Sequence, residues 1–185
     1  MNKTIIKRII IVILVLVAIF LIATIIEESD RLNSYNKLKI QLNTNKIQIE
    51  AGDVIGPLQY VSDSEGTLNV EKKVNTNRPG IGQVIYKVYN KYLKYKEESM
   101  IVEVVDTTPP IIVLNTNNIT IPQNTTIDFY DYLVNAYDNS HPTLLEQVII
   151  DDSRLENKPG TYGVYYSVED SSGNRTVELL TVNIK

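Results

Sequence analysis

Residues 159–174 read PGTYGVYYSVEDSSGN, and this stretch decides the fold. Its apolar residues Val164, Tyr166 and Val168 recur at every second position. A period of two in β-branched and aromatic residues predicts a strand with one face on a core. SSGN at 171–174 predicts a turn, because Gly and Asn tolerate positive φ. The returning segment 175–184 moves its apolar residues from odd to even positions, which predicts a β-bulge.

The chain contains an earlier version of the same pattern. PGIGQVIYKV at 79–88 aligns with PGTYGVYYSV at 159–168, at an offset of 159 − 79 = 80 residues. LNTNKIQIE at 42–50 aligns with LNTNNITIP at 114–122, at an offset of 114 − 42 = 72 residues. The second copy therefore carries 80 − 72 = 8 extra residues, which we place around AYDNSHPT at 136–143. Two copies with the same order of patterns predict tandem domains.

Each copy reads as several short strands separated by turn signals, which predicts an all-β ectodomain of two tandem Ig-like β-sandwiches. We expect domain 1 at 39–106 and domain 2 at 111–185. The linker between them, 107–110, ends in two prolines that stiffen it without forming a ladder.

Three elements of the second copy point to a known family. They are the P-G-T-Y-x-V-x-Y-x-V-x-D-x-x-G-N pattern at 159–174, T-P-P-I-I at 108–112 and D-N at 138–139. With them the second copy resembles the bacterial Ig-like domains of crystal-toxin and surface proteins. The resemblance implies the sandwich fold and an extracytoplasmic setting, in a family whose members serve as spacers, adhesins and carbohydrate-contacting modules.

The first copy is a degenerate sister of the second. Gly82 stands where the second copy has its tyrosine, and the D-N element is missing. KVYNKYLKYKEES at 87–99 replaces the Asp-x-x-Gly-Asn turn.

Residues 9–26 predict a transmembrane helix, because Thr24 is their only polar member. At about 1.5 Å per residue they span about 27 Å, close to the roughly 30 Å hydrocarbon core. The alternative is a cleaved signal peptide, which would have a shorter apolar region and small residues before the cleavage site, whereas bulky Ile25 and Ile26 stand there.

Charges flanking this segment predict its orientation. Residues 1–8 contain three basic residues, whereas the stalk at 27–38 begins with acidic ones. We therefore expect a single-pass protein of the cell membrane, with a cytoplasmic N-terminus and both β domains extracytoplasmic.

Composition excludes several classes of function. From residue 27 onward the chain has 18 − 3 = 15 basic and 22 acidic residues, a net charge of 15 − 22 = −7, so nucleic acid is not an expected partner. Without Cys, and with His141 as the only His, a thiol nucleophile and a zinc site are excluded. Asp151, Asp152 and Asp170 could pair in catalysis, but such small sandwiches seldom hold the cleft this requires. We predict no enzyme, no catalytic residues and no bound cofactor.

Calcium is the one metal that the residues leave open. Ca²⁺ prefers hard oxygen ligands, which Asp106 near the linker could supply together with Asp138, Asn139 or Asp170. No EF-hand spacing is present, and turn-forming Asp and Asn residues account for the same letters.

The second candidate site is the basic and aromatic segment YKVYNKYLKYK at 86–96. Alternation predicts that its tip, with Lys91, Tyr92, Lys94 and Tyr95, lies at the surface. Lysines attract anionic polymers and tyrosines stack on sugar rings, whereas a solvated hairpin explains the same pattern.

The sequence thus predicts a binding, adhesion or spacer module of the bacterial envelope. Its partner would be a cell-wall polymer, a glycan or an envelope protein. The alternative is a structural accessory subunit that its transmembrane helix recruits to an envelope complex.

Overall fold

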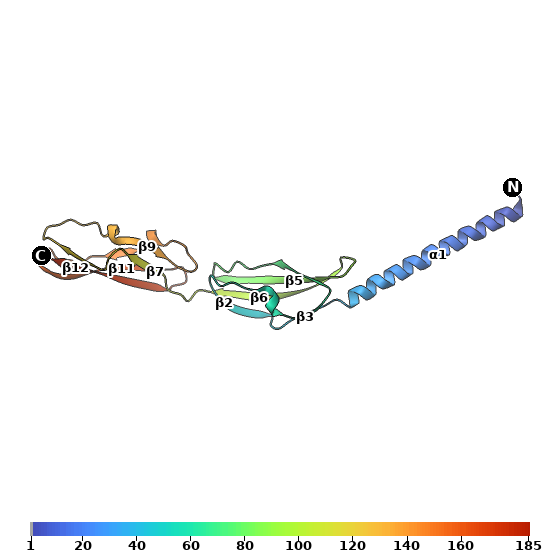
Figure 1. Cartoon of the computed structure of the whole chain (residues 1–185), viewed down its shortest axis with the longest axis horizontal. Helices are drawn as coiled ribbons and strands as arrows, with labels where there is room; N and C mark the ends of the chain where they lie inside the picture. Colours follow the sequence, from blue (N-terminus) through green and yellow to red (C-terminus); the bar gives the residue numbers. More distant parts are fainter. Residues whose placement is uncertain (1) are drawn as a thin grey trace. The chain divides into compact units, whose positions relative to one another are not determined.

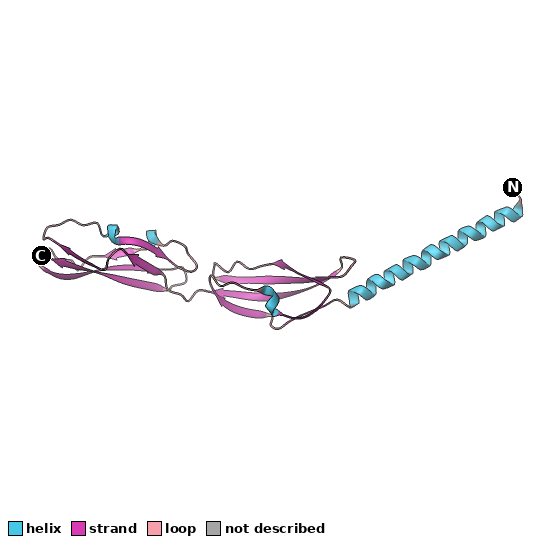
Figure 2. Ribbon diagram, in the orientation of Figure 1, coloured by secondary structure: helices cyan, strands magenta, loops and turns pink. Residues whose placement is uncertain are grey.

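The computed structural model describes residues 2–185, in which one long helix precedes a series of β-strands (Figures 1 and 2). The helix is α1 (Lys3–Asn36). The first repeat contains β1 (Lys39–Leu42), β2 (Lys46–Glu50), β3 (Val61–Glu65), β4 (Thr67–Lys72), β5 (Gly80–Tyr89) and β6 (Tyr95–Val105). The second contains β7 (Ile111–Leu114), β8 (Asn118–Ile121), β9 (Leu133–Tyr137), β10 (Ile149–Asp151), β11 (Gly160–Glu169) and β12 (Arg175–Ile184). Short 3₁₀ helices are η1 (Pro57–Tyr60), η2 (Phe129–Tyr132) and η3 (Leu145–Gln147).

The two repeats have the same sheet topology. In the first, β1 pairs with β3, and a four-stranded sheet has the order β2-β6-β5-β4. In the second, β7 pairs with β9, and the four-stranded sheet has the order β8-β12-β11-β10. The edge pairs β2–β6 and β8–β12 are parallel in both. This equivalence confirms the prediction of two all-β Ig-like repeats that follow one apolar helix.

The compact units of the chain follow different limits from the repeats. One unit comprises the chain up to Asn45 with Gly56–Lys73 and Gln83–Met100, and the other comprises Lys46–Ile55, Val74–Gly82 and Ile101–Lys185. The domain limits predicted from the sequence, 39–106 and 111–185, therefore stay a prediction.

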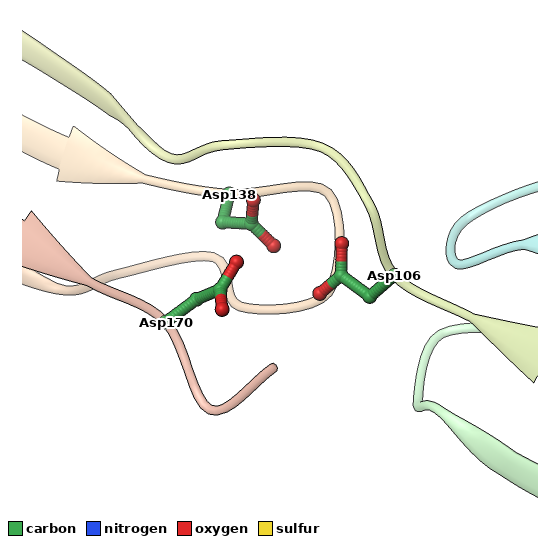
Figure 3. A group of neighbouring side chains, drawn as sticks. All are labelled: Asp106, Asp138 and Asp170. Atoms are coloured by element: carbon green, nitrogen blue, oxygen red, sulfur yellow. The ribbon is translucent and has the colours of Figure 1, made fainter. Parts of the chain in front are cut away.

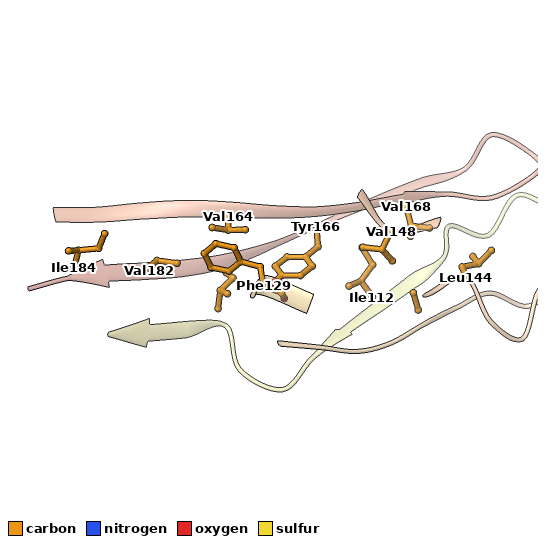
Figure 4. Close-up of a cluster of buried hydrophobic side chains, with 11 residues drawn as sticks. Ile112, Phe129, Leu144, Val148, Val164, Tyr166, Val168, Val182 and Ile184 are labelled. Atoms are coloured by element: carbon orange, nitrogen blue, oxygen red, sulfur yellow. The ribbon is translucent and has the colours of Figure 1, made fainter. Parts of the chain in front are cut away.

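The core of the second repeat lies between its two sheets (Figure 4). Val164, Tyr166 and Val168 of β11 are at most 2% exposed, as their alternation predicted. They pack with residues of β12 and with residues of the facing pair β7–β9, in a cluster that includes Ile112, Ala136, Leu180, Val182 and Ile184. In the first repeat, Val84, Tyr86 and Val88 of β5 are buried in the same alternating manner. Burial of such side chains supplies most of the driving force for folding.

The β-bulge predicted in β12 is absent, and that prediction was wrong. The β11–β12 ladder keeps one register from Gly160 opposite Ile184 to Glu169 opposite Arg175. Val177 and Leu179 lie on the outer face, where they are 49% and 43% exposed. The apparent change of phase arises because this strand carries apolar residues on both faces.

Bulges instead occur beside the repeated LNTN motif. The register shifts between Gln41 and Leu42 in the β1–β3 pair, and between Val113 and Leu114 in the β7–β9 pair. The next residue then bonds across the bulge to a 3₁₀ helix. Asn43 Nδ2 donates to the carbonyl of Gln59 at 3.3 Å, and Asn115 Nδ2 donates to that of Asp131 at 3.0 Å. The motif recurs because both repeats close this corner with the same asparagine.

The repeats differ where the chain passes from the two-stranded sheet to the four-stranded sheet. Gly66 alone joins β3 to β4, with φ of +123°, and a Cβ there would lie 2.6 Å from side-chain atoms of Leu38 and Val88. Residues 138–148 make the equivalent connection between β9 and β10. This longer connection contains most of the extra segment predicted at 136–143.

The helix α1 is long and apolar enough to cross a membrane. It continues past residue 26 to Asn36, so most of the predicted polar stalk is helical. In this polar part Arg31 pairs with Glu27 at 3.2 Å and with Glu28 at 3.4 Å.

Candidate functional site

Three aspartates from separate parts of the sequence meet in one cluster (Figure 3). Asp106 follows β6, Asp138 follows β9 and Asp170 follows β11. Each offers a carboxylate oxygen, and these three oxygens lie within 4.8 Å of one another. The residues are only 8%, 8% and 6% exposed, respectively. The structure therefore brings together three of the four residues predicted as calcium candidates; we call them the three-aspartate cluster.

Asp170 is held by the turn between β11 and β12. Its Oδ1 accepts hydrogen bonds from the backbone N–H groups of Ser172 at 2.8 Å and of Asn174 at 2.9 Å, and its Oδ2 accepts one from Asn174 Nδ2 at 2.9 Å. Burial raises the pKa of Asp170, whereas the hydrogen bonds from Asn174, Ser172 and Gly173 lower it. The hydrogen bonds have the larger combined effect, so the pKa is below its usual value. Asp170 is therefore a carboxylate at neutral pH.

Asp106 is linked to both other loops through hydroxyl donors. Its Oδ2 lies 2.7 Å from Ser140 Oγ and 3.3 Å from Ser172 Oγ. Its backbone carbonyl accepts a 3.1 Å hydrogen bond from Asn174 Nδ2. These contacts fix the end of β6 against the turns that follow β9 and β11.

Asp138 is the least satisfied member of the cluster. Its Oδ1 accepts a 2.8 Å hydrogen bond from the N–H of Ser140, whereas its buried Oδ2 has no hydrogen-bond partner. Ser140 Oγ lies 2.7 Å from Asp138 Oδ1, from Asp106 Oδ2 and from His141 Nδ1. One hydroxyl proton can serve only one of the two carboxylates.

Asn139, the fourth calcium candidate, directs its side chain elsewhere. Its Nδ2 donates to the carbonyl of Ala51 at 2.9 Å and lies 3.4 Å from Glu50 Oε1. It therefore contacts the end of β2 rather than the three-aspartate cluster.

Glu50, which sequence reasoning missed, holds the predicted linker. Its carboxylate accepts hydrogen bonds from the N–H groups of Thr107 at 2.7 Å and Thr108 at 3.1 Å, and from both threonine hydroxyls. The backbone bond from Thr107 is the largest cause that lowers the pKa of Glu50. The signal available in the sequence was the Thr-Thr pair before two prolines. The N–H groups of these threonines need an acceptor, because the chain does not continue as a strand there.

At the second candidate site, Lys91 and Tyr92 contact the helix. Lys91 Nζ lies 2.6 Å from Asp30 Oδ2 of α1, and the Tyr92 hydroxyl donates to the same oxygen. These two hydrogen bonds, from Lys91 first and then from Tyr92, lower the pKa of Asp30. Arg31 lies 5.6 Å from the centre of the Tyr92 ring. The tip of the β5–β6 hairpin is thus attached to the polar end of α1, which the sequence did not indicate.

Lys94 and Tyr95 remain exposed on the hairpin. The Tyr95 ring is 46% exposed and lies 5.4 Å from the ring of Tyr89. Lys87 Nζ lies 4.4 Å from the Tyr95 ring centre. These four residues, Lys87, Tyr89, Lys94 and Tyr95, form what we call the hairpin surface.

The first repeat keeps the turn that its sequence seemed to have replaced. Asn90 Oδ1 accepts from the N–H groups of Tyr92 at 3.0 Å and Lys94 at 2.9 Å, as Asp170 does in the second repeat. Leu93, with φ of 60°, stands where Gly173 has φ of 90°. The expectation of a replaced turn was wrong, because Asn can accept the same hydrogen bonds and leucine tolerates the left-handed conformation at some cost.

The carboxylates considered for catalysis do not gather. Asp151 of β10 is opposite Tyr165 of β11, five positions before Asp170, which corresponds to about 17 Å along the strand. Asp151 and Asp152 are exposed.

Comparison with known proteins identifies the second repeat. Residues 112–184 match the family described as bacterial surface protein, Ig-like domain. This match confirms the resemblance predicted for that repeat. The first repeat lies outside this match and shares the sheet topology of the second repeat. No curated protein matches the chain.

Several solved structures are similar over most of this chain. One is the structure of the M60 catalytic domain with the CBM51-1 and CBM51-2 domains from Clostridium perfringens ZmpB. It is 12% identical in sequence, with a TM-score of 0.45, and the match covers 80% of this chain and 31% of that chain. Human mucin-like protocadherin EC1-2 is 12% identical in sequence, with a TM-score of 0.33, and the match covers 80% of this chain and 98% of the protocadherin chain. The lipoprotein BT2262 from Bacteroides thetaiotaomicron has 15% identity and a TM-score of 0.33, and covers 77% of each chain. With TM-scores below 0.5, these structures carry no inference about function.

Proposed function

We propose that this protein is a membrane-anchored module of the bacterial envelope, which acts by binding or spacing and not by catalysis. The observation that carries the proposal is the order of parts along one chain. An apolar helix is followed by two Ig-like repeats, and the second repeat matches a bacterial surface family. Modules of this kind position or contact other molecules without needing a reactive centre.

In this proposal α1 stays in the membrane as an uncleaved anchor. Residues 9–26 lie in the bilayer, Lys3, Lys7 and Arg8 remain cytoplasmic, and both repeats are extracytoplasmic. Bulky Ile25 and Ile26, where cleavage of a signal peptide requires small residues, favour the uncleaved anchor. The bond between Asp30 and Lys91 attaches the polar end of α1 to the first repeat.

The contact surface that we propose is the hairpin surface, with Lys94 and Tyr95 at its centre. The charge of Lys94 and the exposed ring of Tyr95 suit an anionic wall polymer or a glycan. Lys91 and Tyr92 contribute less to it than the sequence predicted, because Asp30 already neutralises Lys91 and binds the Tyr92 hydroxyl. Their contacts attach the surface to the polar end of the anchor helix.

The proposal is tested by retention of the solubilised full-length protein on isolated cell wall. We expect Lys94→Glu combined with Tyr95→Ala to abolish retention. Lys158→Glu, at a lysine of the second repeat whose side chain is 75% exposed, makes the same charge change elsewhere and should leave retention intact. Equal retention of all three proteins would contradict the hairpin surface as the contact. Protease accessibility of the repeats in intact cells, spheroplasts and lysed cells tests the orientation separately.

The alternative function is that of a structural accessory subunit recruited through its helix. In this alternative the apolar run of α1, residues 9–26, is the surface that contacts a partner within the membrane. Exchange of residues 9–26 for an unrelated transmembrane helix distinguishes the two. A subunit recruited by the helix loses co-purification with its complex, whereas an adhesion module keeps its wall retention.

A further inference from the structure

The three-aspartate cluster (Asp106, Asp138 and Asp170) carries more negative charge than its protein contacts balance. Each residue is more than nine-tenths buried. The ion pairs found among residues 2–185 include none of the three. Like charges that share a buried site repel one another and are costly without a compensating cation.

One carboxylate oxygen of the cluster has no hydrogen-bond partner. Asp138 Oδ2 is buried and has no hydrogen-bond partner. Figure 3 shows its carboxylate directed toward those of Asp106 and Asp170. The nearest hydroxyl, Ser140 Oγ, lies 2.7 Å from both Asp106 Oδ2 and Asp138 Oδ1, and its single proton can be donated to only one of them, so it does not serve Asp138 Oδ2. A cation that accepts electron pairs from these oxygens would balance their charge.

The turn at Asp170 does not require a negative charge. In the first repeat, neutral Asn90 makes the same turn that Asp170 makes in the second, with equivalent bonds at 3.0 and 2.9 Å. Turn chemistry therefore explains an Asp or Asn at position 170, but it does not explain why the charged residue stands beside two further buried carboxylates.

We propose that Asp106, Asp138 and Asp170 bind one Ca²⁺ ion. Calcium takes oxygen ligands at about 2.3–2.6 Å, so two ligands on opposite sides of the ion lie about 4.6–5.2 Å apart. The three oxygens lie within 4.8 Å of one another, which is close enough for one ion to contact all of them. Mg²⁺ is held by only one or two carboxylates at shorter distances and keeps its waters, so three carboxylates favour Ca²⁺. Backbone oxygens and water complete the coordination.

The ion would tie together the ends of three elements. Asp106 lies directly after β6 and before Thr107 and Thr108, whose N–H groups donate to Glu50. Asp138 and Asp170 belong to the loops after β9 and β11. Bound Ca²⁺ thus fixes the start of the 107–110 segment to both loops. This site does not depend on what the hairpin surface contacts.

Calcium titration of the full-length protein in detergent, after removal of metals with EDTA, tests the proposal. We expect one site per chain with a Kd of about 10⁻⁴–10⁻³ M or tighter, as in extracellular calcium modules. In 10 mM CaCl₂ the melting temperature of the repeats, followed by circular dichroism, should rise by about 5–10 °C. The same concentration of MgCl₂ should produce a much smaller shift.

The variant Asp138→Asn distinguishes a cation site from a purely structural cluster, because the expected effects have opposite signs. In EDTA the variant should melt above the wild type, since it removes one of three repelling charges. In 10 mM CaCl₂ it should melt below the wild type and bind Ca²⁺ at least tenfold more weakly. Asp152→Asn, at an exposed aspartate outside the cluster, makes the same change of charge and should behave as the wild type.

Three results would overturn the proposal. The first is a wild-type melting temperature that does not respond to Ca²⁺, a measurement that needs no variant. The second is an equal response to Mg²⁺ and Ca²⁺, which would indicate screening of surface charge. The third is an equal loss of stability of Asp138→Asn in EDTA and in calcium, which would indicate a role in packing alone.

Discussion

The hydroxyl of Tyr166 donates a 2.7 Å hydrogen bond to the backbone carbonyl of Phe129, in the core of the second repeat. The first repeat contains the same bond, from Tyr86 to the carbonyl of Pro57 at 2.9 Å. Each tyrosine lies in one of the two central strands of a four-stranded sheet, β5 or β11. Each acceptor begins a 3₁₀ helix that precedes a strand of the two-stranded sheet, β3 or β9. The bond therefore connects the two layers of each repeat.

Tyr166→Phe should destabilise the protein by about 1–3 kcal/mol, because it leaves the Phe129 carbonyl buried without its donor. Urea unfolding of the full-length protein in detergent, followed by circular dichroism, measures this loss. Tyr165→Phe, which removes a hydroxyl from the outer face of the same strand, should change the free energy of unfolding by less than about 0.5 kcal/mol. Equal effects of the two substitutions would assign no special role to the Tyr166 bond.

Stability should fall at high pH as this tyrosine ionises. Burial raises the pKa of Tyr166 to about 12, with smaller contributions from Tyr132 and Asp128. Because the folded pKa lies above the unfolded value of about 10, the stabilising contribution is complete below pH 10 and is lost as pH rises toward about 12. Unfolding midpoints measured between pH 8 and 12 should decline over this window, and less steeply in Tyr166→Phe. A midpoint that stays constant up to pH 12 would contradict the assignment.

Leu93→Gly should stabilise the first repeat by about 1 kcal/mol, because a left-handed conformation costs an L-residue about 1–2 kcal/mol and glycine little. Leu93 has φ of 60° and its side chain is 79% exposed, so little packing is lost. The reciprocal change, Gly173→Ala at φ of 90°, meets no atom within 4 Å and should destabilise the second repeat by strain alone. Thermal unfolding of both variants measures the pair; destabilisation by Leu93→Gly would show that the leucine side chain makes a needed contact.

Asp30→Ala should release the β5–β6 hairpin from the helix. The substitution removes the shared acceptor of Lys91 and Tyr92, so amide hydrogen exchange should increase in residues 27–36 and at the hairpin tip. Glu27→Ala removes a carboxylate one turn earlier, which pairs only within the helix with Arg31. It should leave exchange at the hairpin tip unchanged, and an equal increase in both variants would indicate general fraying of the helix.

Short-range patterns explain how much of the fold could be predicted. Alternation at Val164, Tyr166 and Val168 directly reports which side chains face the core, and the internal repeat carried that inference to β5. The same logic failed in β12, because Val177 and Leu179 are apolar yet face outward. A period of two identifies a buried face only where the other face is polar.

The candidate site was less accessible to sequence reasoning. Asp106, Asp138 and Asp170 were predicted as calcium candidates and lie together, but Asn139 was included with them because sequence spacing does not reveal the direction of a side chain. Its amide bonds to Ala51 instead. The contacts of Asp30 with Lys91 and Tyr92 join residues about sixty positions apart, between a helix and a hairpin with no shared motif. Only the folded chain shows that part of the basic tip is already neutralised.

The single-residue connection at Gly66 has a consequence for how the two repeats can diverge. A larger residue there would meet Leu38 and Val88 at 2.6 Å, so the first repeat has no room at this crossing for sequence change. The second repeat crosses through residues 138–148, and that excursion is where Asp138 is found. The long crossing of the second repeat can therefore accept changes in length and side-chain chemistry that the single-residue crossing of the first repeat cannot. A loop grafted into residues 138–148 should leave the second repeat folded, whereas a loop grafted at Gly66 should destabilise the first.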